Sequence, residues 1–237
     1  MPGTLYLLPT QLGPTDWVSV LPAGTQQVAC GLHYFIVENA KTARASLKWL
    51  SHPEPLREIS IEDLPEKATA DEIEHLLAPL LAGQDAGLMS EAGCPGVADP
   101  GATVVRRAHA LGIPVRPLVG PSSLLLALMA SGLDGQRFAF HGYLPQRDPE
   151  RSTRIGELEK ESRHKRQTQL FIETPYRNEA LFDALLSQCQ PPTLLCIAKN
   201  LTNADEWVQT QTIAVWRKMP KPPLERQPTV FLLLSGY

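Results

Sequence analysis

Residues 90–101 read Ser-Glu-Ala-Gly-Cys-Pro-Gly-Val-Ala-Asp-Pro-Gly, and this stretch decides how the rest of the chain is interpreted. Its three glycines and two prolines fix a tight path that leaves backbone N–H and C=O groups exposed. It follows a short apolar strand predicted over residues 87–90 and precedes a helix predicted over residues 102–111. Ligands of open α/β sheets bind at such strand ends. The stretch is therefore either a ligand site or an ordinary connection in which Asp99 caps the following helix.

A second turn of the same kind lies at residues 119–123, which read Val-Gly-Pro-Ser-Ser. Pro121 suits the first turn of a helix, where its missing N–H costs nothing. Ser122 or Ser123 can cap the helix predicted over residues 124–131, and the helix start can receive a polar or anionic group. Neither turn has the GxSxG, GxGxxG or GxxxxGK[ST] pattern, so serine hydrolase, NAD and ATP chemistry are disfavoured.

Strands and helices alternate on both sides of these turns. Two strand–turn–helix units in succession, joined by short loops, predict parallel strands with right-handed connections. The rhythm changes near residues 112–118, so we expect an α/β protein of two domains, residues 1–115 and 116–237. The predicted strands are residues 4–8, 34–37, 87–90, 113–115, 138–141, 169–172, 193–198 and 229–234, and the longer helices are residues 41–51, 70–82, 102–111, 147–166 and 178–189.

Composition limits the classes of function. The chain has 237 residues with 43% hydrophobic and 20% charged residues, as in an ordinary globular protein. A formal net charge of -3 argues against indiscriminate binding to nucleic acid. The cysteines form no CxxC pair and have no histidine at ligand spacing, so we expect reduced thiols and no metal site. They are Cys30, Cys94, Cys189 and Cys196.

The N-terminus carries no targeting signal that we can identify. Residues 1–9 are apolar, but they are few, carry no positive charge and run into a Pro-Thr turn. The longest apolar runs are too short to cross a bilayer. We therefore expect a cytoplasmic protein with no membrane partner.

The order of the motifs resembles that of the tetrapyrrole methylase superfamily, which are class III S-adenosylmethionine-dependent methyltransferases. Within it, the chain is most similar to the branch that methylates a cytidine ribose 2′-hydroxyl of the small-subunit ribosomal RNA. The resemblance covers nearly the whole chain. The motifs are LYLLPTQLG at 5–13, SEAGCP at 90–95, DPG at 99–101, GPSS at 120–123, FAFHGYLP at 138–145, FIETPYR at 171–177, AKNLT at 198–202 and the final strand at 230–236.

The resemblance implies two α/β domains with S-adenosylmethionine in a cleft between them, and a homodimer. It also implies ribosomal RNA or the small ribosomal subunit as the partner. The implied cofactor contacts from the first part of the chain, largely through backbone groups, are Pro9, Ser90, Glu91, Ala92, Gly93, Val97, Ser122 and Ser123. Those implied from the second part, around the adenine, are Glu173, Thr174, Leu201 and Thr229.

Methyl transfer to a ribose hydroxyl requires that the hydroxyl oxygen, the methyl group and the sulfur lie in line, and that a protein group activates the hydroxyl, which is a poor nucleophile. The sulfonium of the cofactor already makes its methyl group electrophilic. The hydroxyl benefits from a base or a polarising cation, for which Glu38, Lys41 and Arg44 are the candidates. The alternative interpretation of these three residues is a solvated helix face.

Two further hypotheses remain open at this stage. The RNA-directed branch typically has Glu-Asp-Thr-Arg where this chain has Glu-Asn-Ala-Lys at residues 38–41, and lysine does not replace the bidentate contacts of arginine. The acceptor could therefore be a tetrapyrrole or another small molecule, or the chain could bind the cofactor without catalysis. Residues 147–166 hold seven Lys or Arg and five acids, which predicts either a solvated helix with internal ion pairs or a phosphate-facing flap.

Overall fold

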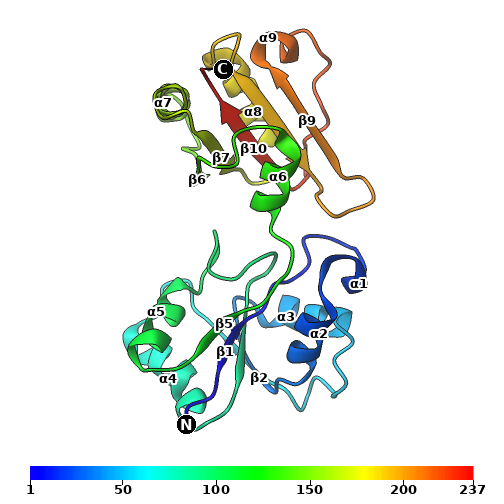
Figure 1. The fold of residues 1–237 in the computed structure, drawn as a ribbon, viewed down its shortest axis with the longest axis vertical. Helices are drawn as coiled ribbons and strands as arrows, with labels where there is room; N and C mark the ends of the chain where they lie inside the picture. Colours follow the sequence, from blue (N-terminus) through cyan, green and yellow to red (C-terminus); the bar gives the residue numbers. More distant parts are fainter. Residues whose placement is uncertain (237) are drawn as a thin grey trace. The chain divides into compact units, whose positions relative to one another are not determined.

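The computed structural model describes residues 1–236, and it divides the chain into two compact units between Ser122 and Ser123 (Figure 1). The boundary expected between residues 115 and 116 falls at the start of β5 (Val115–Pro117). That strand pairs with β1 (Leu5–Leu7), so it belongs to the sheet of the first unit. The division between the units therefore lies within the turn at residues 119–123, just before its last residue. Each unit is described by itself.

The first unit is built on one five-stranded sheet in which every pairing is parallel. The strand order is β3-β2-β4-β1-β5. The strands not yet introduced are β2 (Tyr34–Val37), β3 (Ser60–Asp63) and β4 (Ala86–Met89). Parallel pairing puts the carboxyl ends of all five strands at the same edge of the sheet, which confirms the α/β arrangement predicted for this part.

Helices cover both faces of this sheet. Alternate strand residues point to opposite faces, so Ile36 joins the apolar cluster with α4 and α5, whereas Phe35 joins the cluster with α2 and α3. A Thr69–Glu72 capping box starts α4, and Asn39 caps α3 through its side-chain oxygen. The helices are α1 (Trp17–Val20), α2 (Ala23–Cys30), α3 (Ala40–Trp49), α4 (Ala70–Leu81) and α5 (Ala102–Ala110).

The second unit has a mixed five-stranded sheet of order β6-β7-β10-β8-β9. β6 pairs with β7 in parallel, whereas β10 is antiparallel to both β7 and β8, and β9 is antiparallel to β8. The strands are β6 (Phe138–Tyr143), β7 (Thr168–Ile172), β8 (Leu194–Lys199), β9 (Trp207–Thr212) and β10 (Thr229–Leu234). The helices are α6 (Ser123–Ser131), α7 (Glu150–Lys165), α8 (Asn178–Gln188) and α9 (Ile213–Trp216).

One apolar cluster forms the core of the second unit. Phe171 and Phe231 stack across β7 and β10 with ring centroids 6.0 Å apart, and α7 contributes Ile155 and Leu158. Burial of these large side chains supplies most of the stabilisation of this face of the sheet. The predicted arrangement of two α/β domains is confirmed by the two sheets and their helices.

The charged helix α7 is anchored to the second unit. Its buried face carries Ile155 and Leu158, and Arg154 forms ion pairs with Glu157 and Glu161 along the helix. Lys165 Nζ, for example, lies 3.3 Å from Glu161 Oε2, four residues earlier. These pairs agree with the interpretation of residues 147–166 as a solvated helix and not with a flexible flap.

Candidate functional site

The loop after β1 meets the loop after β4 at the carboxyl edge of the first sheet. The backbone N–H of Thr10 donates to the carbonyl oxygen of Gly93 at 2.9 Å, and the two residues form an isolated bridge. The Thr10 hydroxyl also donates to the carbonyl oxygen of Ser90 at 3.4 Å. The residues after Pro9 therefore hold the start of the glycine-rich stretch in place.

The turn at residues 119–123 closes on the same two loops. The thiol of Cys94 donates to the carbonyl oxygen of Pro121 at 3.5 Å. A Cβ atom added to Gly120 would lie only 2.5 Å from Cβ of Pro9, so the backbone of this turn touches the end of β1 as only glycine allows. The structure thus brings together the two turns that the sequence indicated as parts of a ligand site.

The implied cofactor contacts of the first unit differ in exposure. Ser90 and Gly93 are buried, and Gly93 has a φ of 74°, in the left-handed region that favours glycine. Glu91 and Ala92 are exposed, and Val97 is an exposed large hydrophobic side chain, 48% accessible. This turn therefore presents Glu91, Ala92 and Val97 to solvent, while Ser90 and Gly93 anchor it in the fold.

Three carboxylates gather at this edge. Glu38 follows β2, and its Oε2 accepts a hydrogen bond at 3.0 Å from the backbone N–H of Glu91. The pKa of Asp99 is raised from its ordinary 3.8 to about 6. Burial is the largest cause, followed by the negative charge of Glu38 and, to a smaller extent, that of Glu91, while a hydrogen bond with Ser90 lowers the pKa. The edge therefore has a negative potential and holds one carboxyl that titrates close to neutral pH.

The helix-cap interpretation of Asp99 is wrong. Helix α5 begins after Gly101, which occupies the N-cap position with a φ of 130°, and no side chain caps the helix. Asp99 is instead half-buried among the carboxylates of the turn. Sequence reasoning missed its role because its burial and the nearby charge of Glu38, which follows β2, arise only in the folded chain.

Of the three candidate catalytic residues, the structure brings only Glu38 to the glycine-rich turn. Lys41 and Arg44 are exposed on α3. The guanidinium of Arg44 donates to the carbonyl oxygen of Ala40 at 3.4 Å. Within residues 1–236, neither cation is hydrogen bonded or ion paired to residues 90–101. Both stay candidates as solvent-facing cations.

Gln11 is a further polar group of this edge that the sequence did not single out. Its Oε1 atom is buried and has no hydrogen-bond partner among residues 1–236. A buried acceptor without a donor is costly unless another molecule supplies the donor. The only signal in the sequence is its position two residues after Pro9, within the motif at residues 5–13.

The implied contacts of the second unit also lie together, at one edge of its sheet. Glu173 and Thr174 follow β7, and Leu201 follows β8. Thr229 begins the antiparallel strand β10 and pairs with Lys199 at the end of β8. The end of a strand and the start of its antiparallel neighbour share an edge, so these residues meet although they come from distant parts of the sequence.

Glu173 is the charged group of this second edge. Its side chain is 2% exposed, and Oε1 accepts hydrogen bonds at 2.6 Å from the guanidinium of Arg177 and from the backbone N–H of Thr174. Leu201 and Thr229 are buried, and the Thr229 hydroxyl donates to the carbonyl oxygen of Gln227 at 2.9 Å. The arrangement fixes the Glu173 carboxyl group against an arginine.

No metal centre or membrane span is found in the part of the chain that the structure describes. Residues 1–236 contain no group of three histidines, cysteines or acids placed to hold a metal ion. The helices formed by these residues are all too short or too polar to cross a bilayer. The four cysteines are free thiols.

Comparison with known proteins gives one family. A sequence profile described as Tetrapyrrole (Corrin/Porphyrin) Methylases matches residues 35–215. Ribosomal RNA small subunit methyltransferase I of Xylella fastidiosa (strain Temecula1 / ATCC 700964) is 31% identical over 90% of this chain and 74% of that protein. The protein of the same name from Pseudomonas aeruginosa is 33% identical over 74% of this chain and 58% of its own length. The chain thus spans about three quarters of the first relative and less than two thirds of the second.

A solved structure, described as the crystal structure of the methyltransferase CobJ, has the same fold. It matches with a TM-score of 0.63 over 98% of this chain and 94% of that chain, at 16% sequence identity. The likeness at this identity concerns the fold alone. The family profile covers more than half of the chain, in agreement with the motifs at the strand ends. The chain is a methyltransferase, and it belongs to the tetrapyrrole methylase family.

Proposed function

We propose that this enzyme transfers a methyl group from S-adenosylmethionine to RNA, with the ribose 2′-hydroxyl of a ribosomal RNA cytidine as the acceptor. The observation that carries the proposal is the 31% identity, over 90% of the chain, to a relative named Ribosomal RNA small subunit methyltransferase I. The cytidine ribose follows from the resemblance of the motifs at residues 90–101, 171–177 and 198–202.

The strand-end groups of the first unit fit the proposed cofactor. Its sulfonium and amino groups are cationic, and the carboxylates of Glu38, Glu91 and Asp99 favour a cation at this edge. The buried Oε1 atom of Gln11 lacks a hydrogen-bond donor among residues 1–236, and a ligand amino or hydroxyl group would supply one. The backbone of residues 90–93 would hold the methionine and ribose parts, assisted by Pro9, Val97, Ser122 and Ser123.

The residues proposed for the adenine come from the second unit. Thr174 and Thr229 offer hydroxyls, Leu201 offers an apolar surface, and Glu173 is fixed by Arg177. A rigid carboxylate and an apolar side chain are groups that recognise the polar edge and the flat face of a base. Their gathering at one edge of the second sheet supports this proposal.

The chemistry needs a proton acceptor beside the ribose hydroxyl. The cofactor would supply an electrophilic methyl group: its methyl–sulfur bond would break as the ribose oxygen takes the methyl, leaving S-adenosylhomocysteine, and the protein would have to accept the hydroxyl proton. Asp99, with a pKa of about 6, is ionised at pH 7.5 and basic enough to take this proton on a carboxylate oxygen. The negative charge of Glu38 would make the ionised Asp99 a stronger proton acceptor, because it raises the pKa of Asp99. Lys41 and Arg44 would contribute positive charge for the phosphates of the acceptor.

The test is transfer of labelled methyl from S-adenosylmethionine to three acceptors: small ribosomal subunits, deproteinised ribosomal RNA and a precorrin-like tetrapyrrole. We expect label in RNA, at a nucleotide resistant to alkaline cleavage because its 2′-oxygen is blocked. Asp99→Asn should lower the rate about 100-fold, with binding of S-adenosylhomocysteine retained. Label in the tetrapyrrole and in no RNA would overturn the RNA acceptor, and cofactor binding without any transfer would make the chain a non-catalytic binding protein.

We also propose that the enzyme is a homodimer, as the family resemblance implies. Sedimentation equilibrium at micromolar concentration tests this independently of the acceptor. A mass near twice the 26.1 kDa of one chain is expected. A mass of one chain at the highest concentration would contradict it.

A further inference from the structure

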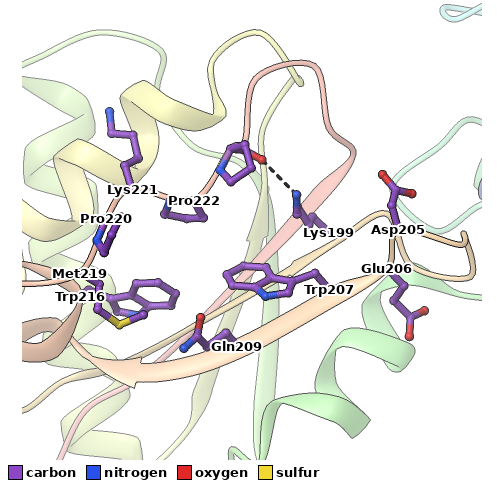
Figure 2. Close-up of a pocket in the computed structure, with 11 residues that line it drawn as sticks. Lys199, Asp205, Glu206, Trp207, Gln209, Trp216, Met219, Pro220, Lys221 and Pro222 are labelled. Atoms are coloured by element: carbon purple, nitrogen blue, oxygen red, sulfur yellow. Dashed lines mark hydrogen bonds between the residues drawn. The ribbon is translucent and has the colours of Figure 1, made fainter.

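The second unit carries a pocket of about 580 Å³ at its edge strand β9 (Figure 2). Lys199, which pairs with Thr229, lines it, but none of the four residues proposed for the adenine does. β9 forms one wall, and the segment from Met219 to Pro223 forms the other. Figure 2 shows Trp207 in the middle of the pocket, with Trp216 and Met219 at one end and Asp205 and Glu206 at the other. The pocket thus has an apolar end and an acidic end.

Trp207 offers a rigid aromatic surface in this pocket. Its ring meets that of Trp216 at an angle of 64°, with centroids 6.3 Å apart. Trp216 is buried, donates its indole N–H to the carbonyl oxygen of Leu195 at 2.9 Å and packs edge-on against Phe182. Because Trp216 is fixed by the core, the half-exposed Trp207 ring is held in one orientation.

Polar groups without a protein partner surround this ring. Among residues 1–236, neither the indole N–H of Trp207 nor the side-chain amide of Gln209 has a hydrogen-bond partner. Together they present two kinds of donor and one carbonyl acceptor. A ligand with a flat face and an edge that both donates and accepts hydrogen bonds would satisfy them.

The charges of the pocket give such a ligand a direction. Lys199 Nζ lies 5.8 Å from the centroid of the Trp207 ring and donates to the carbonyl oxygen of Pro223 at 3.2 Å. Asp205 accepts from the amide of Asn200, and Glu206 accepts from the backbone N–H of Thr202. These bonds hold the two carboxylates at their end of the pocket, where they repel an anionic group.

We propose that this pocket binds one unpaired nucleobase, stacked on Trp207 and hydrogen bonded by Gln209. Base–tryptophan stacking tolerates any base, and the amide of Gln209 can pair with a base edge. The phosphate would lie near the ammonium group of Lys199, which stands over the Trp207 ring. In the setting of the proposed function, the base belongs to a single-stranded part of the RNA acceptor; a free nucleotide has the same chemistry.

A proline-rich peptide is the alternative occupant of a tryptophan-lined groove. Here the protein itself places Pro220, Pro222 and Pro223 along the wall opposite β9. The groove therefore already contains the prolines that such a peptide would bring. The polar groups of the groove that have no protein partner, the indole N–H of Trp207 and the amide of Gln209, can form hydrogen bonds with the edge of a base.

The experiment measures the anisotropy of a labelled single-stranded RNA decamer titrated with the full chain and its variants. Trp207→Leu keeps an apolar side chain against Trp216 and should weaken binding about tenfold, whereas Trp207→Phe should retain most of it. Gln209→Ala should weaken binding about threefold. Gln211→Ala is the matched control on the same strand, outside the pocket, and should change nothing. Competition by a double-stranded hairpin should be weak.

Each result bears on the proposal. Equal affinity of wild type and Trp207→Leu, equal effects at Gln209 and Gln211, or binding of a proline-rich peptide but no nucleotide would overturn it. Competition by free cytidine or adenosine monophosphate at equal molarity would support the nucleobase and assign a free nucleotide as its source. Calorimetry of S-adenosylmethionine on the same variants separates the two proposals, because Trp207→Leu should leave cofactor binding unchanged. A methyl-transfer failure with intact Trp207-dependent RNA binding would overturn the proposed function alone.

Discussion

The two sheets place their candidate ligand groups at an edge by different routes. In the first unit, all five strands are parallel, so each loop after a strand arrives at the same edge. In the second unit, β10 runs antiparallel to β7 and β8, and the edge combines two strand ends with one strand start. The segments that follow strands in the sequence therefore contain the candidate site residues of the first sheet, but only some of those of the second sheet, where Thr229 lies at the start of a strand.

The two edges also differ in charge. Glu38, Glu91 and Asp99 share the first edge, where burial, and then repulsion by the other two carboxylates, raise the pKa of Asp99 to about 6. At the second edge, Glu173 is buried but is neutralised by Arg177 at 2.6 Å. The first edge therefore suits a cationic ligand group, whereas the second suits neutral polar groups.

The core of the second unit depends on its stacked phenylalanines. Phe231→Ala removes a fully buried ring that stacks on Phe171, and we expect a loss of about 3–5 kcal/mol in the free energy of unfolding. Urea denaturation followed by circular dichroism measures it. Phe138→Ala, at a ring that is 42% exposed on β6, is the control and should cost less than about 1 kcal/mol. Similar losses for both variants would contradict the packing described here.

Close contact between the turn at residues 119–123 and the end of β1 is specific to the first unit. Gly120→Ala places a Cβ 2.5 Å from Pro9 and 2.7 Å from Leu21, so we expect a loss of about 1–3 kcal/mol and weaker binding of S-adenosylhomocysteine. Thermal unfolding and calorimetry measure the two effects. Gly135→Ala has no atom within 4 Å of the added Cβ and should alter neither. Unchanged cofactor affinity in Gly120→Ala would show that this turn is not part of the cofactor site.

The raised pKa of Asp99 predicts a pH dependence of stability in the protein without ligand. The folded state holds the Asp99 proton up to about pH 6, whereas the unfolded state loses it near the ordinary 3.8. Stability is therefore lost as pH rises from about 4 to 6, and Asp99→Asn should gain on wild type over that range. After a discount for partial exposure, the gain at pH 8 is roughly 1 kcal/mol. Urea unfolding of both proteins between pH 4 and 8 measures this difference, and equal stability across the range would contradict the raised pKa of Asp99.

The smallest effect is expected on the exposed face of α7. Lys165→Ala removes an ion pair with Glu161 in which the lysine side chain is 54% exposed, and it should cost only about 0.3 kcal/mol. If α7 is a solvated helix, RNA affinity should change little in the anisotropy assay. A large loss of RNA affinity with unchanged stability would instead restore the phosphate-facing interpretation of residues 147–166.

The sequence predicts the local parts of this molecule well. The helix expected over residues 70–82 is observed as Ala70–Leu81, because its apolar spacing and capping box are both local. Strands β3 and β9 are missed, since Ser-Ile-Glu-Asp and Trp-Val-Gln-Thr-Gln-Thr are edge strands without a continuous apolar run. These two strands form because they pair with the buried strands β2 and β8, and a short window of sequence does not show that pairing.

The candidate site is predicted in part for the same reason. The turns at residues 90–101 and 119–123 are visible as glycine- and proline-rich segments at strand ends. The proximity of Glu38 to Asp99 depends on β2 lying beside β4 in the sheet. From the local sequence, Asp99 could be a helix cap. In the structure Gly101 takes the cap position, and Asp99 is a half-buried carboxyl of the candidate site with a raised pKa.

The central claim is that the strand-end turns of the first unit bind S-adenosylmethionine. Isothermal titration calorimetry of the full chain with S-adenosylmethionine and with S-adenosylhomocysteine tests it most directly, with Gly120→Ala and Gly135→Ala as the paired variants. We predict saturable binding of both ligands to wild type and Gly135→Ala, and a clear loss of affinity in Gly120→Ala. Absence of binding of either ligand to the wild-type chain would contradict the claim.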